Sequence, residues 1–195
     1  MKPPDKVFLF SGHLVDTPDR REPRFPVDKE SLAAARIGAA LDALGAGPGD
    51  LALAQGAAGG DILFGEACLA RGVPLQLLLP LAEPEFIATS VLPCSAGEAW
   101  RLRYQALRAP GTTAAHYARG AWPAAVRPPG RAGNPYERCN RWLLYSALAY
   151  GLDRLRFICL WDGGNGDGAG GTAHMVEEVR RRTGRITWLD TRELW

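Results

Sequence analysis

Short runs that are almost entirely apolar recur along the chain, separated by longer segments in which apolar positions follow a helical period. Strands are expected at five of these runs, 6–10, 51–54, 73–79, 156–161 and 186–189. Continuous apolar runs are typical of parallel strands that are buried on both faces of a sheet. Because such strands alternate with helices, the pattern predicts a Rossmann-like three-layer α/β domain with a mostly parallel sheet of five or more strands.

Helices are expected between these strands, at 29–44, 62–71, 81–108 in two pieces, 134–150 and 172–182. Asp28 is expected to cap the first of them. Asn134, Pro135 and Glu137 together are typical of a helix start, with an N-cap, a proline at the first position and a glutamate at the third. A chain of 195 residues fits one domain, so we expect a single domain over 1–195.

Two segments show neither the continuous apolar runs of the expected strands nor the helical period. Residues 14–27 are polar and contain several prolines and arginines, which predicts a long basic loop. Residues 109–133 contain four prolines and four glycines, and this composition predicts an extended loop or lid.

The charge of the chain is nearly balanced, but its distribution is uneven. Lys and Arg number 23 and Asp and Glu number 21, so the net charge is +2, far from a strongly basic balance. Eight arginines fall within 98–141, where they either attract an anionic ligand or cover helix faces with charge. They are Arg101, Arg103, Arg108, Arg119, Arg127, Arg131, Arg138 and Arg141.

The cysteines and the hydropathy pattern predict a cytoplasmic protein without a metal site. The four cysteines lack the paired spacing of a zinc site or a redox dithiol, so we expect them to be reduced and mostly buried. The apolar run near the N-terminus covers only 7–10, which is too short for a signal peptide. No stretch approaches the ~20 apolar residues of a membrane span, so no membrane partner is expected.

Three glycine-containing turns follow expected strands, and each could bring backbone N–H groups to a ligand phosphate. Parallel strands place such turns at one edge of the sheet, where helix N-termini carry partial positive charge. Glycine allows an anion to approach the backbone closely because it has no Cβ. The candidate ligand-binding residues are Ser11, Gly12, His13, Gly56, Gly59, Gly60, Arg138, Gly164, Gly170, Gly171 and Thr172.

The third turn also contains a formal Gly-x-Gly-x-x-Gly pattern at Gly166, Gly168 and Gly171, with Asp190 after the next strand. This spacing imitates a dinucleotide fingerprint. The turn is much longer than the tight fingerprint loop, and no further mononucleotide half follows it. A nicotinamide-dependent oxidoreductase is therefore not favoured, and no cofactor is predicted.

The order of these motifs resembles that of a known superfamily. The segment from Gly56-Ala57-Ala58-Gly59-Gly60-Asp61 to Gly72 is similar to the turn after the second strand of SLOG domains. These include the Lonely Guy phosphoribohydrolases and the DNA-processing protein A family. Tyr136-Glu137-Arg138-Cys139, a strand, a glycine-rich turn, Thr172 and a glutamate are similar to the Lonely Guy order Glu-Arg-Lys, strand, Pro-Gly-Gly-x-Gly-Thr-x-x-Glu. The resemblance implies a domain that binds a nucleotide-derived ligand.

In the phosphoribohydrolases, the resemblance implies an arginine and a carboxylate that flank an N-glycosidic bond. The matching candidates are Arg138 with Glu177 or Glu178. The residue three positions after Thr172 is Met175, however, and the two glutamates lie about 100–200° further around the helix. For other polar residues nearby, structural roles are favoured, namely helix capping for Asp61 and Glu137 and an exposed or satisfied ring for His174.

Three functions remain open at this point. The favoured one is a domain that binds a nucleotide or nucleotide-derived ligand as a sensor or recognition module. The alternatives are a nucleoside 5′-monophosphate phosphoribohydrolase of Lonely Guy type and a DNA-binding module whose face is the arginine-rich segment. The near-neutral charge makes a nucleic-acid partner the less favoured choice. The identity of the ligand, its turnover, the oligomeric state (a homodimer included) and membership of a longer chain stay open.

Overall fold

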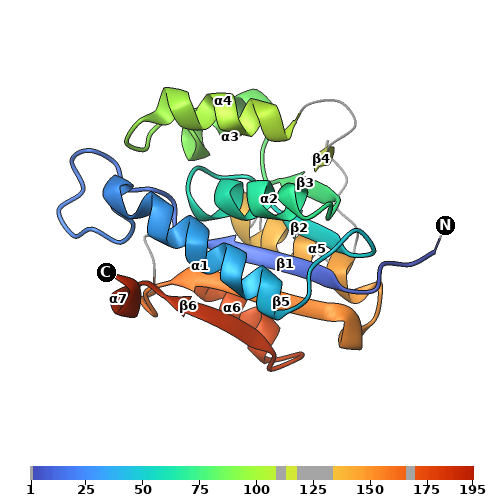
Figure 1. Ribbon diagram of the computed structural model, residues 1–195. Coiled ribbons are helices and arrows are strands. Elements are labelled where there is room, and N and C mark those ends of the chain that lie inside the picture. Colours follow the sequence, from blue (N-terminus) through green and yellow to red (C-terminus); the bar gives the residue numbers. More distant parts are fainter. Residues whose placement is uncertain (1, 109–112, 118–133, 166–169) are drawn as a thin grey trace.

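Six parallel strands form the central sheet in the order β4-β3-β2-β1-β5-β6 (Figure 1). The structure is a computed structural model that describes residues 2–108, 113–117, 134–165 and 170–195. The strands are β1 (Val7–Gly12), β2 (Leu51–Ala54), β3 (Leu75–Leu79), β4 (Thr113–Tyr117), β5 (Leu155–Trp161) and β6 (Ile186–Asp190).

Helices cover both faces of the sheet. The bounds are α1 (Glu30–Ala43), α2 (Gly60–Ala70), α3 (Glu83–Ser90), α4 (Gly97–Leu107), α5 (Pro135–Leu148), α6 (Thr172–Arg180) and the short α7 (Thr191–Leu194), with 3-10 turns at Val27–Lys29 and Leu152–Arg154. Helices α1 to α4 pack on one face, and α5 and α6 pack on the other (Figure 1). None of the helices in the described ranges is long and apolar enough to cross a bilayer.

Alternation along the strands separates two apolar cores. In β1, Phe8 and Phe10 point to the core under α1 and α2, whereas Val7 and Leu9 point to the core under α5 and α6. All four side chains are buried, which explains why the strand reads as a continuous apolar run. The four cysteines are also buried and free, as expected.

The fold class expected from the sequence is confirmed, and two local expectations are wrong. Residues 113–117 fall in the expected loop, yet they form β4, which pairs along the whole of β3. The remainder of 109–133 lies outside the described residues. Asp28 does not cap α1, because it lies in a 3-10 turn and Lys29 occupies the N-cap position. Asn134 does cap α5, since its side chain accepts a hydrogen bond from the Tyr136 amide at 2.8 Å.

The chain changes direction in the sheet between β1 and β5. From β1 it adds β2, β3 and β4 on one side, and then α5 returns it to β5 on the other side of β1. Neighbouring crossovers therefore leave the carboxyl ends of β1 and β5 in opposite directions. Ligands of open α/β sheets bind in the crevice that such a switch point creates.

Gly59 lets the segment after β1 lie directly on the start of α2. The Val15 amide donates to Ala58 O at 3.1 Å, and the Gly60 amide donates to His13 O at 3.1 Å. Gly59 has a φ of +107°, and a Cβ there would lie 2.7 Å from Val15 N. The close approach of these two backbones therefore depends on the absence of a side chain at position 59.

We expect Gly59→Ala to lower the free energy of unfolding by about 3 kcal/mol or more, because it combines a strained φ with a backbone clash. Two matched controls separate these causes. Gly151 has a φ of +111° with open space around it, and Gly47 has open space without a positive φ. Gly151→Ala should cost about 1–2 kcal/mol and Gly47→Ala less than about 0.5 kcal/mol, measured by urea unfolding. Equal losses of unfolding free energy in Gly59→Ala and Gly151→Ala would mean that the backbone shifts enough to relieve the clash with Val15 N.

Candidate functional site

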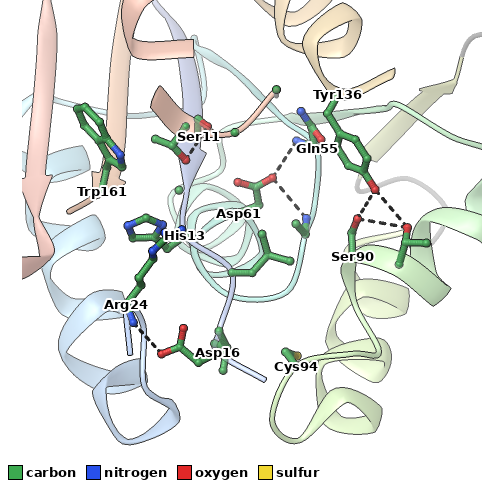
Figure 2. Close-up of a pocket in the computed structure, with 18 of the residues that line it drawn as sticks. Ser11, His13, Asp16, Arg24, Gln55, Asp61, Ser90, Cys94, Tyr136 and Trp161 are labelled. Atoms are coloured by element: carbon green, nitrogen blue, oxygen red, sulfur yellow. Dashed lines mark hydrogen bonds between the residues drawn. The ribbon is translucent and has the colours of Figure 1, made fainter. Parts of the chain in front are cut away.

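A cavity of about 480 Å³ opens at the carboxyl ends of β1 and β5. This volume falls within the ~300–1,000 Å³ range of small-molecule sites. Its walls come from the segment after β1, the turn after β2, the end of α3 and the starts of α5 and α6 (Figure 2). Segments far apart in the sequence thus meet at the switch point of the sheet.

All three expected turns reach this cavity, and the second of them does so through Gln55 and Ala57. Ser11 Oγ donates to Thr172 Oγ1 at 3.2 Å, which joins the end of β1 to the start of α6. The expected ligand-binding residues that line the cavity are Ser11, Gly12, His13, Gly170, Gly171 and Thr172. The first and third turns therefore face one another across the β1–β5 edge.

The other expected ligand-binding residues are not among the described residues that line the cavity. Gly56, Gly59 and Gly60 belong to the second turn, but their backbones contact protein groups. Gly164 lines a separate, smaller hollow of about 340 Å³, and its amide donates to Asp162 Oδ1. Arg138 lies in the first turns of α5 and is likewise not part of the described lining.

The carboxylate of Asp61 occupies the ring of backbone amides that the second turn forms. Asp61 Oδ2 accepts hydrogen bonds from the amides of Gln55, Gly56 and Ala57 at 3.2, 3.0 and 3.3 Å (Figure 2). Successive backbone N–H groups of this kind commonly bind phosphate. Here an internal anion takes that place, so the amides of the second turn are engaged within the protein although Gln55 and Ala57 line the cavity.

Asp61 therefore has a role other than the helix cap expected from the sequence. Gly59 occupies the N-cap position of α2, and the Asp61 side chain instead holds the turn that precedes the helix. Burial raises the pKa of Asp61 from 3.8 to about 6, and the hydrogen bonds from Ala57, Gly56, Gln55 and Gly12 oppose that rise. The energetic cost of burying the charge thus outweighs the gain from the amides.

His13 lines the cavity as a neutral side chain. Burial lowers its pKa, although Asp162 nearby raises it in part. The Asp162 amide donates to His13 Nε2 at 3.0 Å, and the Asp162 carboxylate lies 3.2 Å from the same atom. An Nε2 that accepts this amide hydrogen leaves the ring proton on Nδ1. The end of β5 thereby fixes the ring that follows β1.

Two arginines of the basic loop line the cavity, each beside a carboxylate. Arg20 Nε lies 3.3 Å from Asp16 Oδ1, and Arg24 Nε lies 3.5 Å from Asp162 Oδ2. Asp16 also closes the loop, because its Oδ2 accepts from the amides of Arg24 and Phe25 at 2.9 Å each. Composition predicted a basic loop over 14–27, but sequence reasoning did not assign these side chains to the site.

A chain of side-chain amides connects the second and third turns, and sequence reasoning missed it. Asn140 Nδ2 donates to Gly170 O at 2.7 Å, and Asn140 Oδ1 accepts from Gln55 Nε2 at 2.8 Å. Asn140 is 1% exposed. It lies three and four positions before Leu143 and Leu144, on the buried stripe of α5. A polar residue on an otherwise apolar stripe was the signal that could have identified it.

Neither candidate catalytic glutamate is among the described residues that line the cavity. Glu177 is 62% exposed and pairs with Arg181 on the helix surface. Glu178 is buried, and its Oε2 lies 2.8 Å from Arg182 Nη1. Both carboxylates therefore pair with arginines four positions further along the chain, at and just after the C-terminal end of α6.

The arginine-rich segment does not form a continuous basic face in the described residues. Arg101 pairs with Glu98, Arg103 with Glu66 and Glu30, and Arg108 with Glu83, all at 2.6 or 2.7 Å. Arg119, Arg127 and Arg131 lie outside the described residues. Arg103 thus joins α4 to α1 and α2, and Arg108, at the C-cap of α4, joins it to α3.

The chemistry that the cavity wall can offer is polar binding more than nucleophilic attack. Cys94 lines the cavity, but burial raises the pKa of its thiol to about 11, so the thiol is neutral at pH 7. Within the described ranges, no group of three or more His, Cys, Asp and Glu side chains is arranged to hold a metal ion.

A scan against models of protein families gives no match for this chain, and a search of curated proteins gives no significant match.

We expect Asp61→Asn to change how stability depends on pH. A folded pKa of about 6 against 3.8 means that this carboxyl stabilises the fold at low pH and loses up to about 3 kcal/mol of that contribution as the pH rises through 6. The free energy of unfolding of the native protein minus that of the variant should therefore fall between pH 4 and pH 7, measured by urea unfolding. Because the pKa of His13 is lowered in the folded protein, His13 makes the free energy of unfolding rise with pH. This contribution is present in both proteins and cancels in the difference. A difference that rises with pH would show that the amides stabilise the Asp61 anion more than burial destabilises it.

Proposed function

We propose that the cavity at the β1–β5 edge binds a nucleotide or nucleotide-derived small molecule, with its phosphate toward the start of α6. The observation that carries this proposal is the convergence of the Ser11-Gly12-His13 turn and the Gly170–Thr172 turn on one cavity at the switch point of the sheet. That position is where open α/β sheets hold their ligands.

The start of α6 supplies the donors that a phosphate needs. The first N–H groups of a helix have no acceptor within the helix, and the helix dipole adds partial positive charge at this end. Gly170 and Gly171 precede α6 and line the cavity together with Thr172. The absence of a side chain at Gly170 lets the turn lie directly on the start of α5, since a Cβ there would lie 2.6 Å from Glu137 N.

The charge of the cavity wall favours a ligand with a small negative charge. Arg20 and Arg24 are offset by Asp16 and Asp61 among the described lining residues, and His13 is neutral. Attraction for an anion therefore comes mainly from the helix start and from the hydroxyl of Thr172, which accepts from Ser11 Oγ and keeps its own hydrogen for a ligand. A nucleoside monophosphate fits this balance better than a polyphosphate or a nucleic-acid strand.

The SLOG resemblance supports the same proposal, and recognition of the ligand is preferred over its hydrolysis. The carboxylates that the Lonely Guy order suggested, Glu177 and Glu178, pair with arginines away from the described cavity wall. The paired arginines of α4 give no support to a DNA-binding face. A cytoplasmic sensor or recognition domain is the function that we infer.

We expect a nucleoside monophosphate to raise the thermal midpoint, because a ligand at a hundredfold excess over Kd adds about 2.7 kcal/mol to the folded state. AMP should give a larger shift than adenosine, and Thr172→Val should reduce the shift because it removes a hydroxyl from the cavity wall. Glu177→Gln, outside the described wall, is the matched control and should keep the full shift. The proposal fails if millimolar AMP, GMP, CMP, UMP and ADP-ribose all leave the midpoint unchanged.

We expect no free base to accumulate when the protein is incubated with AMP, GMP, CMP or UMP, because neither candidate glutamate belongs to the described wall of the cavity. Chromatography of the reaction mixture measures this directly. Steady release of base over many turnovers, lost in Arg138→Ala and in Glu178→Gln, would replace the recognition proposal with the hydrolase.

A further inference from the structure

The orientation of the Gln55 side-chain amide is determined by a chain of hydrogen bonds that begins at the backbone. The carbonyl oxygens of Gly170 and Gly171 can only accept hydrogen bonds, and Asn140 Nδ2 lies 2.7 and 3.4 Å from them. The nitrogen end of the Asn140 amide must therefore face these carbonyls. Its oxygen then faces Gln55.

The same reasoning determines which end of Gln55 meets Asn140. Asn140 Oδ1 can only accept, so the nitrogen of the Gln55 amide must be the donor at 2.8 Å. Asn140 is nearly inaccessible to solvent, and the reverse arrangement would place two oxygens in contact inside the protein. The carbonyl oxygen Oε1 of Gln55 is consequently directed away from Asn140.

Gln55 Oε1 is an acceptor without a hydrogen-bond partner in the described ranges of the chain, and Gln55 lines the cavity. Figure 2 shows this side chain between Asp61 and Tyr136. The neighbouring polar groups are already engaged. Asp61 Oδ2 accepts from backbone amides, and Tyr136 Oη lies 2.8 Å from Ser90 Oγ.

We propose that Gln55 Oε1 is a specificity-determining acceptor that selects ligands with an N–H or O–H group at this wall of the cavity. This inference rests on the proposed nucleotide-binding function and names the polarity of the group that is recognised. The donors of this kind in a nucleotide are the exocyclic amines of adenine, cytosine and guanine, the ring N–H of guanine and uracil, and the hydroxyls of the ribose. A ligand that presents an oxygen acceptor here would leave two acceptors facing each other.

The test compares ligands that differ in one donor, using the full chain and isothermal titration calorimetry. AMP against IMP, and CMP against UMP, replace the exocyclic amine by an oxygen. AMP against its 2′-deoxy and 3′-deoxy forms removes one ribose hydroxyl. In the native protein, at least one of these pairs should differ in Kd by on the order of tenfold, and the pair that differs identifies the source of the donor.

Two substitutions of Gln55 separate acceptor chemistry from side-chain packing. Gln55→Met removes the acceptor at similar volume and should abolish the tenfold preference. Gln55→Glu, studied at acidic pH where its carboxyl is protonated, keeps a carbonyl acceptor for the ligand and an O–H donor for Asn140 Oδ1, and it should retain the preference. Glu177→Gln changes an exposed residue outside the described wall and is the matched control that should keep the native preference. The thermal midpoint of each variant without ligand reports whether it folds.

The outcomes distinguish this inference from the proposal on which it rests. If the native protein binds none of these nucleotides, the proposed function fails and this inference fails with it. If the native protein binds them and Gln55→Met keeps the same preference, or no pair differs, the inference alone is contradicted. Loss of the preference in both Gln55→Met and Gln55→Glu would assign the effect to the bond with Asn140 and would also contradict it.

Discussion

The buried carboxylate of Asp61 is the constraint on which the geometry of the candidate site depends. It lies at the start of α2 and accepts hydrogen bonds from three consecutive amides of the turn after β2, while Gly12 adds a bond from the end of β1. Two strand ends are thereby held by one side chain. Because burial opposes the charge on this group, the turn is stabilised at a cost that varies with pH.

The Asp61 carboxylate occupies the amides of the second turn, so on the proposed function a ligand phosphate would have to meet the amides of another turn. The second turn has the glycines and the exposed amides that commonly bind phosphate, but its amides already have an acceptor. The third turn, before α6, lines the cavity instead, and Asn140 holds it through the carbonyl of Gly170. The second turn thus differs from the described part of the third turn, because its amides enclose a carboxylate of their own chain.

The sequence predicted the architecture well because the architecture depends on local patterns. Apolar runs, helical periods and the Asn134 cap can each be recognised from a few neighbouring residues. The edge strand at 113–117 was missed because it is short and lies next to glycine and proline, and its pairing with β3 is a nonlocal interaction. The glycine turns predicted that the candidate residues lie at one edge of the sheet, since parallel strands end together, and the cavity lies at this edge.

Individual roles in the site could not be predicted, because they depend on contacts between distant segments. Asp61 and Gln55 stand next to the glycines of the second turn, yet whether a carboxylate caps a helix or fills a turn depends on where the backbone folds back. The Asn140 chain joins residues 85 and 30 positions apart. The most that the sequence shows of such a pairing is a polar residue among the apolar residues of a helix stripe.

The engagement of the carboxylates also bears on the choice between recognition and hydrolysis. A carboxylate that activates water needs an oxygen free to accept its proton. Among the described residues of the cavity wall, the carboxylates are Asp16 and Asp61. Asp16 accepts from two amides of the basic loop and lies beside Arg20. Asp61 accepts from the amides of two turns. Both acids hold the backbone in place, which supports the proposed recognition of a ligand over carboxylate-assisted cleavage.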